Sequence, residues 1–206
     1  MKGNLIIISS PSGGGKGTLI KEILHTVPDL RYSVSLTTRA PRFGEEDGRH
    51  YNFVSKSQFE AYAAEGGFLE CAQVHGNYYG TSKEQTERLT DEGHDVILEI
   101  DVQGAAAVLE KVPNAVSIFI LPPSFDVLRA RLTARATEGS DDLALRLRNS
   151  FDEVMQYSRF RYVVINDEVT LAARKLSAII LAERQRRDRQ TAVIQGILDS
   201  FDNSKL

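Results

Sequence analysis

Near the start of the chain stands the run Leu5-Ile-Ile-Ile-Ser-Ser-Pro-Ser-Gly-Gly-Gly-Lys-Gly-Thr18, in which an apolar segment, a glycine loop, a lysine and a helical pattern follow one another. The apolar segment Leu5–Ile8 predicts a buried strand. The small residues after it let backbone N–H groups converge on an anion, and the next helix adds the partial positive charge of its N-terminus. Lys16 supplies a point charge for the outer phosphates. The run therefore predicts a phosphate-binding loop, which consists of Ser10, Pro11, Ser12, Gly13, Gly14, Gly15, Lys16, Gly17 and Thr18.

Two positions depart from the usual pattern of such a loop. Ser10 stands where the pattern opens with glycine, and Gly17 stands where serine or threonine usually follows the lysine. Thr18 comes one position later and is therefore the candidate hydroxyl for Mg²⁺, bound directly or through water. A glycine turn that binds nothing is the alternative. We disfavour it because a buried strand, three successive glycines and a lysine coincide.

The composition is that of a globular chain with a slightly negative net charge, so any site that binds an anion must be local. Its 206 residues and 42% hydrophobic content suffice for one α/β domain with insertions. The net charge of −3 makes nucleic acid and anionic membranes unexpected partners. A single cysteine excludes an internal disulfide and a cysteine zinc cage. Because we find no signal peptide and no apolar run of about 18 residues, we expect a cytoplasmic protein.

Strand patterns alternate with helical patterns along most of the chain. This order and the phosphate loop predict an α/β fold of the P-loop NTPase type, with a parallel sheet flanked by helices. Besides Leu5–Ile8, strands are predicted at 95–101, 116–121 and 162–165, and helices at 16–26, 103–111 and 170–189. The core domain comprises 1–32, 84–125 and 150–206. The arginine-rich stretch 184–189 is interpreted as a solvated helix end or an oligomer contact, which leaves a homo-oligomer open.

Residues 33–83 predict a small β-rich insertion, with strands at 32–39 and 51–54 and helices that begin at capping boxes at Ser57 and Ser82. Arg39 and Arg42 flank Pro41, which favours a polyproline-like stretch in which residues three apart share an edge. Both guanidinium groups can then face one phosphate. A pair of solvated surface arginines is the alternative, and the residues alone leave it open.

Glu99 and Asp101 lie at the C-terminal end of the strand predicted at 95–101. Residues two apart in a strand share a face, and ligands bind at this edge of open α/β sheets. An acidic side chain there can hold Mg²⁺, directly or through water. Solvated acids are the alternative, which is disfavoured because the loop lysine is already placed.

Residues 126–149 contain two short arginine-rich helical patterns separated by a break at Gly139. Arg131 and Arg135 are four apart and share a helix face, and Arg146 follows on the second helix. The segment is interpreted as a helical lid. A charged surface hairpin is the alternative that stays open.

Segments spread over nearly the whole chain resemble the guanylate kinase family, and they occur in the family's order. Their number and order exclude chance agreement. They are Ser10 to Thr18, Ser33-Val-Ser-Leu-Thr-Thr-Arg-Ala-Pro-Arg42, Tyr51-Asn-Phe-Val54, Gly76-Asn-Tyr-Tyr-Gly-Thr81, Ile100-Asp-Val-Gln-Gly104, Ile118-Phe-Ile-Leu-Pro-Pro-Ser124 and Val164-Ile-Asn-Asp167.

The resemblance implies roles for particular residues. It implies a clamp on the GMP phosphate, a set of guanine contacts, and lid arginines that close over the transferring phosphate. It associates Glu99, in place of the family's aspartate, with magnesium, and it makes Lys16, Arg39 and the lid arginines catalytic. The clamp consists of Arg39, Arg42, Tyr51 and Tyr79; the guanine contacts are Ser35, Glu70, Thr81 and Asp101; the lid arginines are Arg131, Arg135 and Arg146.

The resemblance also implies the reaction, in which the γ-phosphate of ATP passes to GMP, and to dGMP, with Mg²⁺ as cofactor, as part of purine nucleotide metabolism and GMP recycling. Guanine presents N1–H and an exocyclic amine side by side, so the acceptor-only carboxylates Glu70 and Asp101 suit it. Adenine would leave a buried carboxylate unpaired. No protein nucleophile is expected, because the GMP oxygen attacks in line and the protein supplies positioning and charge. Lid closure would exclude water.

Three other functions are weighed against this one. A kinase of the same fold that acts on a ribose bisphosphate would not need Glu70 and Asp101 as base readers. A non-catalytic module that binds phosphopeptides would usually lack the phosphate loop that this chain keeps. A GTPase switch is disfavoured because no Asn-Lys-x-Asp motif follows a strand.

Overall fold

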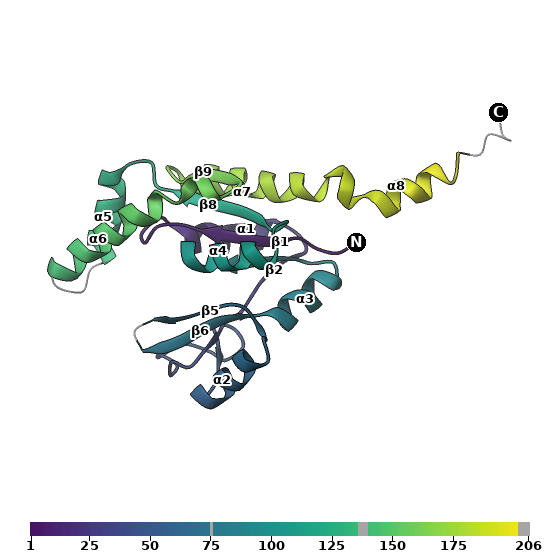
Figure 1. The fold of residues 1–206 in the computed structure, drawn as a ribbon. Coiled ribbons are helices and arrows are strands. Elements are labelled where there is room, and N and C mark those ends of the chain that lie inside the picture. The colour runs from purple at the N-terminus through teal and green to yellow at the C-terminus, as the bar shows by residue number, and fades with distance from the viewer. Residues whose placement is uncertain (75, 136–139, 202–206) are drawn as a thin grey trace.

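The computed structural model describes residues 1–74, 76–135 and 140–201, with their side chains other than those of 135 and 140–142. At its centre is a five-stranded sheet in the order β2-β7-β1-β8-β9, in which every neighbouring pair is parallel. Helices cover both faces of this sheet (Figure 1), so the predicted α/β architecture is confirmed. The strands are β1 Leu5–Ser9, β2 Leu30–Tyr32, β7 Asp95–Glu99, β8 Val116–Leu121 and β9 Tyr162–Ile165.

The side chains of β1 alternate between two buried clusters. Ile6 and Ile8 pack in one cluster with residues of α1 (Lys16–Thr26) and α7 (Val169–Arg184), whereas Ile7 packs in the other with residues of α4 (Val102–Lys111). A parallel strand covered on both faces needs apolar residues at every position. This requirement explains the unbroken apolar run that made the strand recognisable in the sequence.

A second, four-stranded sheet lies apart from the central one, in the order β4-β3-β6-β5 (Figure 1). It is joined to the core by α3 and carries α2, whose Phe59 ring stacks on Phe68 with the ring centroids 4.4 Å apart. The elements of this region are β3 Leu36–Thr37, β4 Asn52–Phe53, α2 Lys56–Ala64, β5 Phe68–Val74, β6 Asn77–Ser82 and α3 Lys83–Asp91.

The alternation over 32–39 predicted a single strand, and this prediction is wrong. β2 ends at Tyr32, and the N–H of Ser33 still bonds to the carbonyl of Ile97 in β7 at 3.0 Å. The carbonyl of Ser35 instead accepts from the N–H of Asn52 in β4 at 2.9 Å. The chain therefore passes from one sheet to the other between these serines, and β3 belongs to the second sheet.

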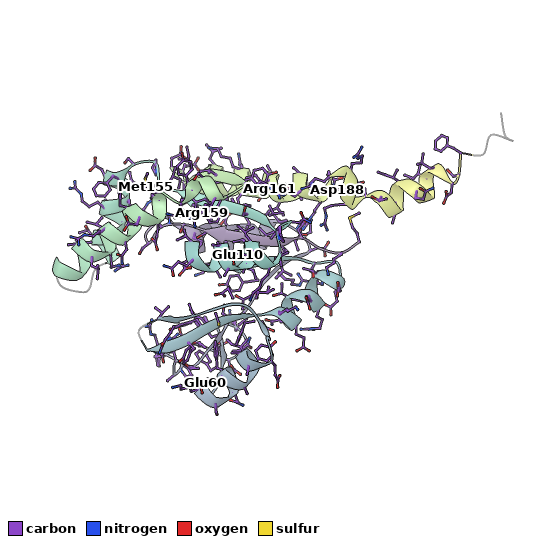
Figure 2. The ribbon with its side chains drawn as sticks, in the orientation of Figure 1. Glu60, Glu110, Met155, Arg159, Arg161 and Asp188 are labelled. Carbon is purple, nitrogen blue, oxygen red and sulfur yellow. The ribbon has the colours of Figure 1, made fainter. Side chains whose placement is uncertain are left out.

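Two helix boundaries also differ from the prediction. The first capping box is formed by Ser55 with Gln58 and not from Ser57, because the Ser55 side chain accepts from the N–H of Gln58 at 3.2 Å. The last predicted helix ends at Arg184 and is followed by the short 3₁₀ helix Arg187–Arg189. Asp188 marks this junction in Figure 2.

The remaining helices project from the central body in Figure 1. Helices α5 (Phe125–Arg135) and α6 (Ser140–Val154) lie at one end of the sheet, and α8 (Thr191–Leu198) extends away at the other. The predicted break at Gly139 lies outside the described residues. In the part of the chain that the structure describes, no helix combines the length and hydropathy needed to cross a bilayer.

Arg184 forms an ion pair with a buried carboxylate, which corrects the interpretation of 184–189 as a solvated helix end. Its Nε donates to Oδ2 of Asp95 at 2.7 Å, and its Nη2 donates to the carbonyl of Pro28 at 2.7 Å. The Asp95 side chain is only 3% exposed, and its other oxygen accepts from the N–H of Asn4 at 2.6 Å. The pair thus joins α7 to the first residue of β7.

Replacement of Arg184 by alanine should lower the free energy of unfolding by about 3 kcal/mol, because it leaves the Asp95 carboxylate buried without its counter-charge. Urea unfolding at neutral pH measures the change. Arg88→Ala is the matched control, since it removes an exposed pair with Glu92 at 3.7 Å and should cost at most ~0.5 kcal/mol. Equal losses in the two variants would contradict a special role for the buried pair.

Candidate functional site

The phosphate loop joins β1 to α1, and its course requires glycine. Gly13 and Gly15 have φ angles of +80° and +90°, in the left-handed region that favours glycine. A Cβ on Gly15 would lie 2.3 Å from Nδ2 of Asn166. That same Nδ2 donates to the carbonyl of Gly14 at 2.9 Å. Asn166, directly after β9, therefore packs against the loop and fixes one of its carbonyl groups.

Arg131 approaches the loop from α5. Its Nη2 donates to the backbone carbonyl of Asn166 at 3.0 Å. Its Nη1 is buried without a hydrogen-bond partner and lies 3.9 Å from the position that a Cβ on Gly15 would take. An unpaired, buried guanidinium nitrogen beside the loop is costly unless a ligand accepts from it. Of the three predicted lid arginines, this one is therefore beside the loop already in this structure.

Lys16, the first residue of α1, lies among carboxylates. Its Nζ donates to the carbonyl of Ile100 at 3.0 Å. Burial lowers the pKa of Lys16, and the nearby charges of Glu99 and Asp101 oppose this effect. The acids at the end of β7 thus help keep the lysine charged.

Glu99 ends β7 and faces the start of α1. Its Oε2 accepts from the hydroxyl of Tyr32 at 3.2 Å, and its Oε1 lies 3.6 Å from the position of a Cβ on Gly17. Burial, and next the charge of Glu99, raise the pKa of Tyr32, so its hydroxyl remains a donor. Thr18 is exposed on the first turn of α1. The carboxylate therefore occupies the side of the helix where the usual loop pattern has its hydroxyl.

A cavity of about 280 Å³ lies beside Lys16 and opens toward the second sheet. Its lining brings residues of the loop, the end of β7 and the second sheet together. Of the residues predicted from the sequence, it contains Lys16, Ser35, Tyr51, Glu70, Tyr79, Glu99 and Asp101, and it adds Tyr32 and His50, which the sequence analysis did not single out.

Glu70 and Asp101 come close together beside Gly104, since an oxygen of each lies 3.4 Å from the position of a Cβ there. Thr81 donates from Oγ1 to Oε1 of Glu70 at 2.6 Å. Burial raises the pKa of Glu70, and the bond from Thr81 opposes the rise. We expected Asp101 to share a strand face with Glu99, and this prediction is wrong. β7 ends at Glu99, and Asp101 caps α4 by accepting from the N–H of Gly104 at 2.7 Å.

Arg39 is held by a carboxylate. Its Nη2 donates to both oxygens of Glu45, at 2.8 and 3.0 Å, and the N–H of Arg42 donates to the same group at 2.7 Å. The Arg39 guanidinium lies 5.4 Å from the Tyr51 ring centroid, and the rings of Tyr51 and Tyr79 meet edge to face at 5.9 Å. Donors from both arginines can therefore converge on a single anion, although Arg42 uses its backbone here and its side chain is exposed.

The side chains of three predicted site residues are not seen to contact the loop or the residues that line the cavity. The Arg42 side chain does not line the cavity, and Arg146 is half-buried on α6. The side chain of Arg135 lies outside the described ones. Asn166, in contrast, was missed as a loop contact. Its position directly after a strand predicted from the sequence, at the edge where ligands bind, was the signal that could have found it.

Comparisons with known proteins agree over most of the chain. The family profile described as guanylate kinase matches residues 2–183. A guanylate kinase of Neisseria meningitidis serogroup A is 51% identical over 199 residues, which cover 97% of each chain. One from Caldanaerobacter subterraneus subsp. tengcongensis is 48% identical and covers 91% of each chain. The crystal structure of guanylate kinase from Anaplasma phagocytophilum matches with a TM-score of 0.77 and 32% identity, over 97% of this chain and 95% of that one.

A profile match over most of the chain, identities near one half and a matching fold point to the same conclusion. The chain belongs to the guanylate kinase family of nucleoside monophosphate kinases.

Proposed function

We propose that this protein transfers the γ-phosphate of ATP to GMP, giving ADP and GDP, and that dGMP is a second acceptor. The observation that carries the proposal is the cavity of about 280 Å³, whose lining includes both the loop lysine and the paired carboxylates Glu70 and Asp101. Substrates that react in line must lie next to each other. A site that joins a phosphate donor to a purine reader meets this condition.

The loop end of the site suits the phosphates of ATP. Backbone N–H groups of the glycine loop and the N-terminus of α1 would bind them, with Lys16 at the outer phosphates. Arg131 supports this assignment because its Nη1 is buried beside Gly15 without a partner. A transferring phosphoryl oxygen would accept from it.

The second-sheet end of the site suits GMP. We propose that Glu70 and Asp101 accept from guanine N1–H and its exocyclic amine, with Ser35 and Thr81 as neighbouring contacts. Arg39, Arg42, Tyr51 and Tyr79 would bind the phosphate. The Glu45 carboxylate, which already receives donors from both arginines, supports this role because a phosphate offers the same kind of oxygen acceptors.

The donor set between these ends fits Mg²⁺. Glu99 directs one oxygen toward Gly17 and receives a hydrogen bond from Tyr32 on the other, and the Thr18 hydroxyl is on the same turn of α1. The described residues contain no cluster of three or more His, Cys, Asp or Glu able to hold a metal. Mg²⁺ commonly takes one or two carboxylates and fills its shell with phosphate oxygens and water. When bound, Mg²⁺ would neutralise part of the phosphate charge.

Closure of the lid completes the proposed mechanism. Arg131, Arg135 and Arg146 would converge on the transferring phosphate as the lid segment 126–149 moves toward the second sheet, and closure would exclude water. We place this reaction in the cytoplasm, as a step of purine nucleotide metabolism that recycles GMP.

An ADP-release assay with ATP, Mg²⁺ and a panel of acceptors tests the proposed function. GMP and dGMP should be phosphorylated, and AMP should have a kcat/KM at least about 10³-fold lower, because adenine leaves the half-buried Glu70 carboxylate without a donor from the base. CMP, UMP and ribose phosphates complete the panel. A preference for a ribose phosphate, or no ADP release with any acceptor, would refute the proposal.

A further inference from the structure

Helix α6 contacts the phosphate loop through two residues that the proposed function does not use, Ser150 and Glu153. Oε2 of Glu153 accepts from the N–H of Ser12 at 2.9 Å. Oγ of Ser150 donates to the carbonyl of the same Ser12 at 3.3 Å. Ser150 is fully buried and Glu153 is half-buried. Met155, labelled in Figure 2, directly follows this end of α6.

The two contacts come from one face of α6, since Ser150 and Glu153 are three residues apart. Together they hold both backbone polar groups of Ser12, one at the amide and one at the carbonyl. Ser12 is the last residue before Gly13, where φ becomes positive and the loop turns. The position of its backbone therefore sets the entry into the glycine segment.

A loop rich in glycine has many backbone conformations, and only a few of them direct its amides at one anion. Ordering the loop when the ligand binds would cost conformational entropy. Contacts that hold the loop beforehand remove this cost and raise affinity. Asn166 provides one such contact at Gly14, and α6 provides the other at Ser12.

The charge of Glu153 cannot by itself explain its position. The side chain lies close enough to the phosphate loop to interact electrostatically with Lys16, so a second anion bound there would be repelled by it. A favourable effect on ATP must therefore come from the hydrogen bond to the Ser12 amide. A neutral acceptor of the same shape should provide it as well.

We propose that Glu153 is a positioning residue, which together with Ser150 holds the phosphate loop in its ATP-binding form by fixing the backbone of Ser12. The C-terminal part of α6, which contains Ser150 and Glu153, then stays fixed against the loop, and lid motion is confined to residues 126–149. The inference rests on the proposed function in so far as ATP is the ligand of the loop.

The test compares Glu153→Ala with Glu153→Gln, and uses Asp152→Ala, an exposed carboxylate one residue earlier on α6, as the matched control. Equilibrium dialysis with labelled ATP, without acceptor, gives the dissociation constant of ATP. It should rise about tenfold in Glu153→Ala, the effect of one lost hydrogen bond to a charged acceptor. It should return to within about threefold of the original value in Glu153→Gln, whose Oε1 accepts from the same amide, and stay unchanged in Asp152→Ala.

A KM measurement separates positioning from general damage, because KM for ATP should rise in Glu153→Ala while KM for GMP stays constant. Equal increases for both substrates, an unchanged ATP dissociation constant, or a glutamine variant as weak as the alanine variant would each overturn the inference. If Glu153→Ala does not fold, Ser150→Ala tests the second contact, and unchanged ATP binding there would overturn it too. Dialysis requires no phosphoryl transfer, so a chain that binds ATP but leaves GMP unreacted would refute the proposed function alone.

Discussion

Lys16→Ala should lower the turnover number for GMP phosphorylation by roughly 10³-fold, the loss expected when a cation that stabilises the transferring phosphate is removed. The lysine is the first residue of α1 and donates to the carbonyl of Ile100, which keeps its ammonium group between the loop and the cavity. Alanine leaves the helix start intact, since it is the best helix former. The loss should therefore appear in catalysis and not in folding.

Binding of GMP in the absence of ATP should change by less than about threefold in the same variant, because the proposed base readers lie on other elements. Isothermal titration with GMP and a steady-state ADP-release assay make the two measurements. Lys21→Ala, on the exposed side of α1, is the control and should behave as the unmodified protein. Turnover near normal in Lys16→Ala would refute the assignment of the phosphate loop.

Most of the central sheet could be predicted from the sequence because parallel strands that are buried on both faces consist of continuous apolar runs. The predicted strand 116–121 coincides with the buried strand β8. The predicted strand 162–165 coincides with β9, although β9 is at the edge of the sheet and its Val163 and Ile165 are exposed. The phosphate loop was recognisable for a related reason, since positive φ angles at Gly13 and Gly15 admit little but glycine. Burial of a strand and a positive φ angle each restrict the residue type at the position itself, so both can be recognised in the sequence.

Features that depend on contacts between distant segments could not be predicted in this way. The alternation over 32–39 fits one strand, and only the pairing of Ser33 with β7 and of Ser35 with β4 divides it. Arg184 has the same appearance as its solvated neighbours until Asp95 is placed beside it. Glu153 accepts from a backbone amide 141 positions away in sequence. Because every residue except proline has this amide, the contact does not require a particular residue type at position 12.

Glu70→Gln should reduce the preference for GMP over AMP, expressed as the ratio of their kcat/KM values, by about 10²-fold or more. Thr81 donates to one oxygen of the carboxylate and would hold the amide oxygen of glutamine in its place. The amide nitrogen then replaces the other acceptor and directs two hydrogens at the guanine donors. Adenine N1, an acceptor, would instead receive a bond. Glu65→Gln makes the same chemical change at an exposed site and should leave the ratio constant.

The pH dependence of this ratio gives an independent measure of the same carboxylate. Burial raises the pKa of Glu70, so protonation should begin at a higher pH than for an ordinary glutamate. Below that pKa the group gains a hydrogen and loses an acceptor, and the preference for GMP should fall as the pH is lowered. The phosphates of GMP and AMP ionise alike, so their titration cancels in the ratio. The decline should be absent in Glu70→Gln; the same decline in both proteins, or a ratio that glutamine leaves intact, would remove Glu70 from the guanine site.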